Sequence, residues 1–178
     1  VIFERLFMLR RSRVIPSGLL LEVEGLLKKG MVAEAHARCM ANPASIAQIL
    51  SAGIGKVGQG REEIREALED QGRKETHELD RFINLLGSIA NVATLLGLLG
   101  TIFGMIKAFN VLAGEAVGDP TRLAAGIAEA LLTTAAGLTV AIPAFIANRY
   151  FLGRVDSLVA EMEAYSARIL DHLIKEKE

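Results

Sequence analysis

The sequence predicts an all-α membrane protein in which long transmembrane helices extend into a cytoplasmic helical bundle. Residues 82–106 are 25 consecutive uncharged positions, and residues 130–148 are a further 19. The first run would form a helix ~37 Å long at ~1.5 Å per residue, enough to cross a bilayer, and the second is just long enough. An open strand would leave backbone groups unpaired in lipid. The alternative is two buried helices of a soluble protein, which such long uncharged runs disfavour.

The composition argues against several classes of function. A net charge of −1 gives no basic field for nucleic acid, so no nucleic-acid partner is expected. The single cysteine, Cys39, is expected to be a small buried residue rather than half of an internal disulfide. His36, His77 and His172 lie far apart without a second ligand at metal spacing, so we expect no metal site and no cofactor. No Ser-His-Asp set or carboxylate pair suggests catalytic residues, and we do not expect an enzyme.

A glycine motif at Gly53-Ile-Gly55-Lys-Val-Gly58 matches the pattern of dinucleotide-binding loops. A true site of this kind follows a strand, whereas residues 44–52 have the pattern of an amphipathic helix. Lys56 is followed by valine rather than serine or threonine, so the segment is no Walker motif either. We therefore do not expect nucleotide binding.

The distribution of Lys and Arg predicts the orientation in the membrane. Thirteen of the 20 lie within residues 5–81, and five follow residue 148. Only Lys107 and Arg122 lie near the connection between the uncharged runs. Because positive charge marks the cytoplasmic side, both long polar regions and the C-terminus are predicted to be cytoplasmic, with membrane lipid around the spans.

The beginning of the sequence suggests part of another membrane helix. An apolar opening, Val1-Ile-Phe3, is soon followed by Arg10, Arg11 and Arg13, which is the reverse of the charge order in a signal peptide. We expect that helix to begin before residue 1. The predicted organisation is residues 1–13, the cytoplasmic end of a first transmembrane helix; 14–81, a cytoplasmic helical region; 82–109, a transmembrane helix; 110–122, a periplasmic hairpin; 123–148, a transmembrane helix; and 149–178, a cytoplasmic helical tail.

The polar regions are predicted to be helical. Asn42-Pro43 and Asp119-Pro120 each combine an N-cap residue with a proline at the first helical position. Residues 61–81 are rich in helix formers and in i,i+4 charge pairs, and nothing there interrupts the pattern, so this helix is expected to continue into the first span. After the second span, apolar residues at 3,4 spacing over residues 152–173 predict a packing stripe.

Polar residues within the uncharged runs are the candidates for function. Five in the first run share little more than a third of the helix circumference. They are Asn84, Ser88, Asn91, Thr94 and Thr101. The second run contains Thr133, Thr134 and Thr139. A single hydroxyl can simply bond to the carbonyl four residues before it, but a stripe suggests a face turned toward water, an ion or a partner helix.

One carboxylate, Glu129, lies immediately before the second run. A carboxylate inside or beside the hydrocarbon is costly and usually marks an ion or proton path. The alternative places Glu129 at the level of the headgroups, in water.

Small residues predict where helices pack closely. Gly100 and Gly104 form a GxxxG pattern, Gly97 lies one turn before it, and Gly137 lies among alanines in the second run. Pro143, inside the second run, is expected to kink the helix and to free a carbonyl.

Two segments carry a resemblance to a known family. Residues 96–109, LGLLGTIFGMIKAF, and residues 118–144, GDPTRLAAGIAEALLTTAAGLTVAIPA, closely resemble the ExbB/TolQ/MotA proton-channel family, and within it ExbB most. The resemblance implies three membrane helices and a homopentamer that encloses the single-span helices of two ExbD- or TolR-like partners. Proton flow would then drive a third protein, a TonB- or TolA-like energy transducer, toward the outer membrane.

The resemblance also implies roles for particular residues. Thr101 and Thr134 match the pore threonines and Glu129 the acidic residue of the last helix, with Thr94 and Thr133 as further candidates for the proton pathway. The resemblance favours Thr134 over Thr133, a choice that the residues alone do not make. On an ideal helix Glu129 and Thr134 are ~140° apart.

The function that follows is a proton-channel motor subunit of the bacterial inner membrane, serving TonB-dependent transport. The alternatives are a TolQ-like subunit of the Tol-Pal system, a MotA-like stator and, in a different class, a non-conducting scaffold that holds a partner helix.

Overall fold

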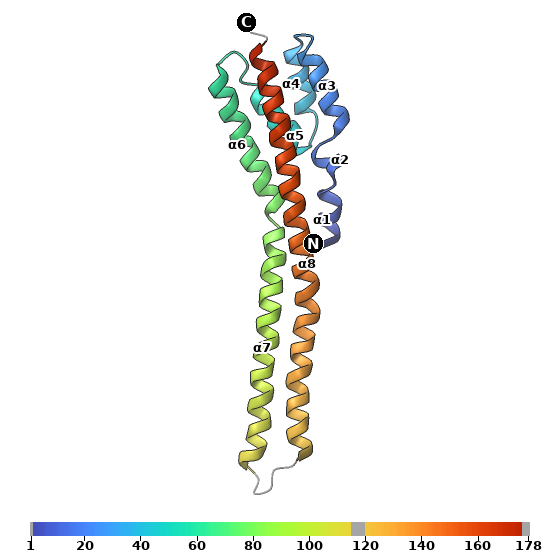
Figure 1. The fold of residues 1–178 in the computed structure, drawn as a ribbon, viewed down its shortest axis with the longest axis vertical. Coiled ribbons are helices and arrows are strands. Elements are labelled where there is room, and N and C mark those ends of the chain that lie inside the picture. The colour runs from blue at the N-terminus through green and yellow to red at the C-terminus, as the bar shows by residue number, and fades with distance from the viewer. Residues whose placement is uncertain (1, 115–119, 176–178) are drawn as a thin grey trace. The chain divides into compact units, whose positions relative to one another are not determined.

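A computed structural model describes residues 2–114 and 120–175, which form eight helices and no strand (Figure 1). The all-α prediction is confirmed for these residues. They divide into two compact units, one formed by Phe82–Tyr150 and the other by Val1–Arg81 with Phe151–Glu178. We call the first the helix-pair unit and the second the bundle unit. The predicted N-cap at Asp119 lies outside the described residues.

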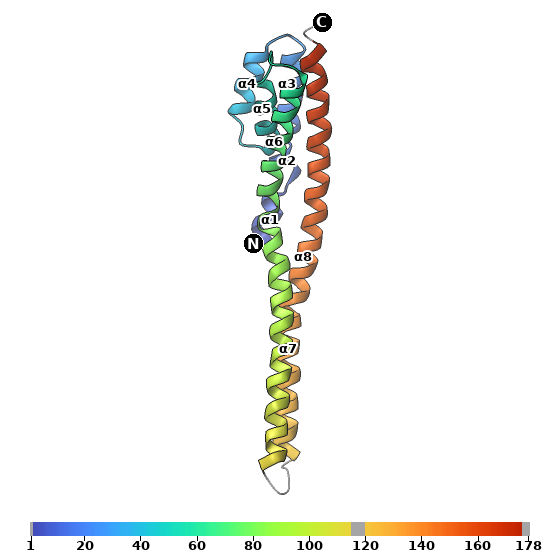
Figure 2. The ribbon, with the colours of Figure 1, turned by 90° about the vertical axis from the view of Figure 1, so that its left-hand side faces the viewer.

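The helix-pair unit consists of α7 (Ile83–Gly114) and the first part of α8 (Pro120–Lys175). Within residues 82–150 the two helices lie side by side and antiparallel, as Figure 1 and Figure 2 both show. Pro120 is the first residue of α8, a position that suits its fixed φ and missing N–H. Both helices reach into the predicted hairpin at residues 110–122, since α7 continues to Gly114.

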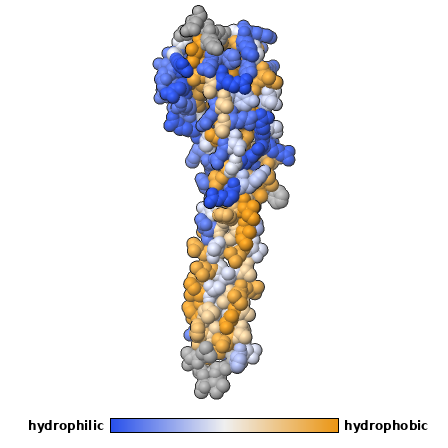
Figure 3. Space-filling view, viewed as in Figure 1, coloured by the Kyte–Doolittle hydropathy of each residue, from blue (hydrophilic) through white to orange (hydrophobic). Residues whose placement is uncertain are grey.

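The face of the helix-pair unit seen in Figure 3 is largely apolar. Leu95, Phe103 and Leu132 are 63%, 63% and 71% exposed, respectively. Contiguous apolar surface on this scale is rare on a soluble monomer and matches contact with lipid tails. Both α7 and α8 are long and apolar enough to cross a membrane. These observations describe a membrane protein.

Small residues hold α7 and α8 in close contact within the helix-pair unit. An ideal Cβ on Gly104 would lie 2.5 Å from the Ala130 Cβ and 2.8 Å from its Cα. An ideal Cβ on Gly126 would lie 2.9 Å from the Ala108 Cβ. Backbones this close gain van der Waals contact, which replaces the hydrophobic driving force that lipid does not provide.

We predict that Gly137→Ala destabilises the protein by about 2 kcal/mol, the cost of an overpacked contact. Its Cβ would lie 2.7 Å from the Ala93 carbonyl oxygen and 2.9 Å from the Gly97 Cα, both of them backbone atoms. Gly153→Ala is the matched control, because its Cβ would meet nothing within 4 Å. Thermal unfolding of the detergent-solubilised full-length protein, followed by circular dichroism, measures both. Equal melting temperatures would contradict the prediction.

The bundle unit contains six helices and the C-terminal part of α8. They are α1 (Ile2–Met8), α2 (Arg11–Val14), α3 (Ser17–Leu27), α4 (Val32–Met40), α5 (Ser45–Ile54) and α6 (Arg61–Asp80). The predicted stripe of α8 is buried here, with Val155, Met162 and Ile169 at most 2% exposed. Val23, Ile46 and Leu50 are fully buried members of the same unit.

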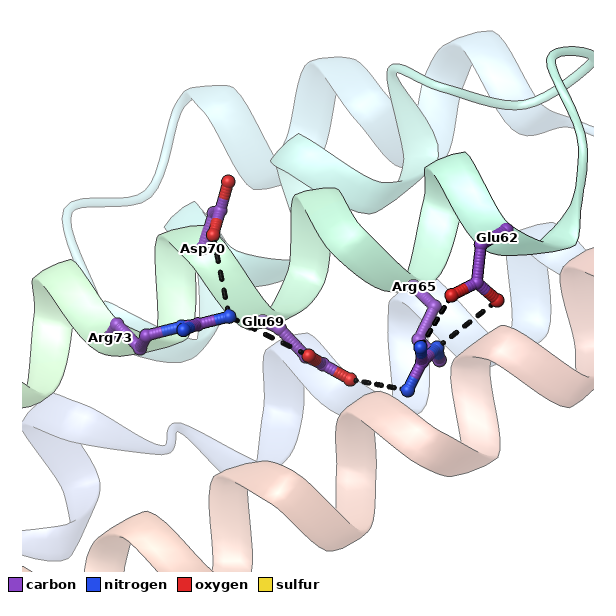
Figure 4. A network of polar contacts seen from close by, with 5 residues as sticks. All are labelled: Glu62, Arg65, Glu69, Asp70 and Arg73. Carbon is purple, nitrogen blue, oxygen red and sulfur yellow. Dashed lines mark hydrogen bonds and ion pairs between the residues drawn. The ribbon is translucent and has the colours of Figure 1, made fainter.

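Ion pairs on the surface of the bundle unit join helices that are distant in sequence. Arg11 pairs with Glu161, and its hydrogen bond lowers the pKa of that carboxyl, which lies beyond the uncharged run of α8. Arg168 pairs with Glu24 at 2.8 Å. Because the arginine of each pair is exposed to solvent, each pair contributes little. On α6 the charges form a local network instead, running from Glu62 to Arg73 (Figure 4).

Two predicted helix boundaries are wrong. Asn42 does not cap a helix beginning at Pro43, because α5 begins at Ser45 and its N-cap is Ala44. The Asn42 side chain instead accepts a hydrogen bond from the Ala44 N–H at 3.0 Å, as in an Asx-turn. The helix of residues 61–81 does not run uninterrupted into the first span either, because a turn at Arg81 and Phe82 separates α6 from α7.

The glycine motif of residues 53–58 lies at the end of helix α5 rather than after a strand. Gly53 is buried within α5, where an ideal Cβ would lie 2.6 Å from the Leu68 Cγ. Gly58 has φ +99°, a conformation that favours glycine at this turn. Packing and turn geometry account for these glycines.

We predict that Cys39 is unreactive in the native protein. It is fully buried in α4, and burial raises the pKa of its thiol to about 11, so very little thiolate exists at pH 8. Maleimide labelling followed by mass spectrometry should be at least about tenfold slower in the native protein than in dodecyl sulfate. Labelling at the same rate in both conditions would contradict the burial of this residue.

Candidate functional site: the polar residues of the helix pair

Thr134 is the hydroxyl that joins the two helices. Its Oγ1 donates a hydrogen bond to the Gly97 carbonyl oxygen, 3.1 Å away on α7. The contact depends on the absence of a side chain at Gly97, where an ideal Cβ would lie 3.4 Å from the Thr134 Cα and from the Gly137 Cα. The candidates Gly97, Thr134 and Gly137 therefore meet at one place in the helix-pair unit.

Four other threonines of the helix pair bond within their own helices. Thr94 donates to the Ala90 carbonyl at 2.9 Å, Thr101 to Leu98 at 2.6 Å, Thr133 to Ala130 at 2.9 Å, and Thr139 to Ala135 at 2.7 Å. This is the simpler of the two roles that the sequence allowed for each hydroxyl. The structure thus distinguishes Thr134 from Thr133, which the sequence pattern alone does not.

Thr101 and Thr133 nevertheless occupy different surroundings. Thr101 is half-buried and lines a shallow hollow of about 460 Å³ on α7, together with Ile102, Met105 and Phe109 among others. Thr133 is exposed but borders the line of contact between α7 and α8, which we call the seam, since an ideal Cβ on Gly100 would lie 2.6 Å from the Thr133 Cβ. No hydrogen bond joins Thr101 to Thr134 among the contacts of the described residues.

Glu129 forms an ion pair with Lys107 across the seam. In the sequence Lys107 is only a charge near the connection between the uncharged runs, and its position there does not predict this pairing. The pairing of small residues indicates this contact. Gly104 faces Ala130 and Ala108 faces Gly126, and this register brings Lys107 close to Glu129. The carboxylate is therefore compensated, and it forms no hydrogen bond with Thr134 among the described contacts.

Asn148 makes a second polar contact that the sequence pattern does not predict. Its amide Nδ2 donates to the Ile83 carbonyl oxygen at 2.7 Å, and the residue is only 8% exposed. An ideal Cβ on Gly87 would lie 3.3 Å from the same Nδ2. Small residues thus admit a polar side chain at this end of the seam, as Gly97 does for Thr134.

Pro143 lies within α8, which continues on both sides of it. Proline has no N–H, so the carbonyl of Thr139 lacks its usual helical donor. The Pro143 side chain is exposed on the surface of the helix-pair unit. The freed carbonyl is therefore a polar backbone group within the apolar stretch of α8.

A profile of the MotA/TolQ/ExbB proton channel family matches residues 41–164, which include both helices of the seam. A putative biopolymer transport protein ExbB-like 1 from Synechocystis is 36% identical over 165 residues, covering 91% of this chain and 61% of that protein. A putative biopolymer transport protein ExbB homolog from Methanothermobacter thermautotrophicus is 33% identical over 90% of this chain and 57% of its own length.

A third relative is the Tol-Pal system protein TolQ from Haemophilus influenzae, which is 38% identical over 85 residues, covering 48% of this chain and 37% of its own. The chain thus spans about three fifths of the length of the two ExbB-like relatives. The matches to ExbB-like proteins cover more of the chain than the match to TolQ.

We predict that Lys107 and Glu129 are energetically coupled by about 1 kcal/mol. Lys107→Glu places two carboxylates together and should lower the melting temperature, while the exchange Lys107→Glu with Glu129→Lys should restore most of the loss. A double-mutant cycle on the detergent-solubilised full-length protein measures the coupling. A coupling of zero would show that the two charges are solvated separately.

Proposed function

Because the chain belongs to the MotA/TolQ/ExbB proton channel family, we propose that it is a proton-channel motor subunit of the bacterial inner membrane. In this proposal it forms a homopentamer around the single-span helices of an ExbD-like partner. It transmits the energy of the proton gradient through a TonB-like transducer to transport across the outer membrane. A proton that falls through ~100 mV releases ~2.3 kcal/mol per charge.

The bond from Thr134 to Gly97 is the observation that carries this proposal. A hydroxyl has one donor and two acceptor sites, so donation to the carbonyl leaves the acceptor sites of Thr134 for a ligand. A protonated carboxyl on a partner helix could donate to that oxygen, and after deprotonation the hydroxyl could turn to donate to the carboxylate. Such a group guides a carboxyl in either protonation state without fixing its charge.

Thr101 and Glu129 complete the proposed pathway, with Thr94 and Thr133 beside it. Thr101 bonds to its own helix and presents its remaining acceptor sites at a surface hollow, where a neighbouring helix would lie in an assembly. Glu129, compensated by Lys107, would mark one end of the path. We place the bundle unit and the C-terminus in the cytoplasm because most Lys and Arg residues belong to these segments.

The second candidate function is that of a TolQ-like subunit in the Tol-Pal system. The similarity to TolQ over 85 residues favours it. The two functions share the same channel chemistry and differ in the partner and in the transducer. Co-purification with an ExbD-like and with a TolR-like single-span protein, compared side by side, identifies which partner the chain binds.

We predict that Thr134→Val abolishes partner-driven uptake by the full-length protein and leaves assembly intact, because valine keeps the shape but removes the hydroxyl. Thr139→Val is the matched control, since Thr139 bonds only to the carbonyl of Ala135 in its own helix. Native mass spectrometry of the variant with its partner checks the assembly, with five subunits and two partner helices expected. Normal uptake by Thr134→Val would favour the non-conducting scaffold instead.

A further inference from the structure

Two arginines in the bundle unit stack on one exposed aromatic ring. The guanidinium Cζ of Arg13 lies 4.1 Å from the centroid of the Phe7 ring, and that of Arg10 lies 5.3 Å from it. All three side chains are exposed, Phe7 by 49%. Stacking on a ring fixes the orientation of a guanidinium, while its N–H groups remain able to donate hydrogen bonds. Two oriented sets of donors therefore face solvent side by side.

The charges of Arg10 and Arg13 are not compensated within the part of the chain that the structure describes. Among the described residues, Arg10 and Arg13 form no ion pair, whereas their neighbour Arg11 is paired with Glu161. Arg11 therefore has its charge partner within the chain. The N–H donors of the other two are therefore open to a negatively charged ligand.

The backbone beneath the arginines is fixed to α8 within the bundle unit. Leu9, between α1 and α2, is only 3% exposed, and its carbonyl accepts a long hydrogen bond of 3.4 Å from the Arg154 Nε. The pair between Arg11 and Glu161 adds a second attachment. Arg10 and Arg13 thus extend from an anchored segment, which reduces the entropy lost when they bind a ligand.

Apolar side chains flank the same cluster. Leu6 and Met8 are 46% and 44% exposed, beside the half-exposed Phe7. A soluble anion would gain no binding energy from contact with these apolar side chains. Exposed leucine, phenylalanine and methionine next to unpaired arginines are the combination found where a protein meets the boundary between headgroups and acyl chains.

We propose that the segment Leu6–Arg13 binds the headgroup of an anionic phospholipid. The guanidiniums of Arg10 and Arg13 donate paired hydrogen bonds to the phosphodiester oxygens, in the forked geometry that arginine offers to phosphate. Leu6 and Met8 contact the upper part of the acyl chains. This goes beyond the proposed channel function, because it requires neither proton flow nor a partner protein.

The test uses the full-length protein with Leu6→Trp and no other tryptophan, reconstituted in phosphatidylcholine vesicles. Quenching by brominated phosphatidylglycerol and by brominated phosphatidylcholine gives the relative association of the two lipids at this position. We expect a preference of about fivefold for phosphatidylglycerol. The preference should fall toward one in 500 mM salt, because the ions screen the charges.

The variant Arg10→Gln with Arg13→Gln should remove the preference. Arg65→Gln with Arg73→Gln is the matched control, since it changes the net charge equally at two exposed arginines that already have carboxylate partners. Equal quenching by both lipids in the parent protein would overturn the proposal. So would an unchanged preference in the Arg10 and Arg13 variant, or an equal loss in the control.

Discussion

The close approach of α7 and α8 is the constraint on which the helix-pair unit depends. Lipid tails give two apolar helices no hydrophobic reason to associate, so contact must come from packing and from bonds between the backbones and polar side chains. Glycine and alanine at the seam let the backbones meet, and an added Cβ at Gly104 or Gly137 would overlap the facing backbone. The two helices stay in contact because no larger side chain separates their backbones.

This packing fixes the register, and the register places the chemistry. With Gly97 against Thr134, the threonine hydroxyl reaches a carbonyl on the other helix. The same register brings Lys107 to Glu129. A slip of one residue would rotate these side chains by ~100° and separate both pairs. The small residues and the polar residues are thus parts of one arrangement rather than two independent features.

The sequence predicts the helices well where one physical signal dominates. The long uncharged runs identify α7 and α8, and the apolar residues at 3,4 spacing identify the buried stripe of α8. Both signals are reliable because lipid and a packed core strongly favour apolar side chains. Prediction from the sequence fails where two local conformations compete. Asn42 can cap a helix or close an Asx-turn with the same side chain, and the structure has the turn. Nothing in the composition near Arg81 and Phe82 marks the break between α6 and α7.

The candidate site is predictable in its residues but not in its contacts. Counting polar residues in an uncharged run finds the threonines, yet only the pairing of two helices shows which one bonds across the seam. Lys107 illustrates the limit most clearly. In the sequence it is a charge at the end of an apolar run, and its meaning depends on a residue 22 positions away. Pairing the small residues of the two runs in antiparallel order would have predicted it.

The charges of the helix pair limit the ways in which it can handle a proton. Among described residues 83–111 and 120–148, Glu129 is the one carboxylate, and Lys107 already compensates it. That carboxylate forms no hydrogen bond with Thr134 among the described contacts. The hydroxyls cannot carry a charge at ordinary pH, although they can donate or accept. A carboxyl on a partner helix would bring an ionisable group to the Thr134 hydroxyl, which is why it belongs in the proposed mechanism.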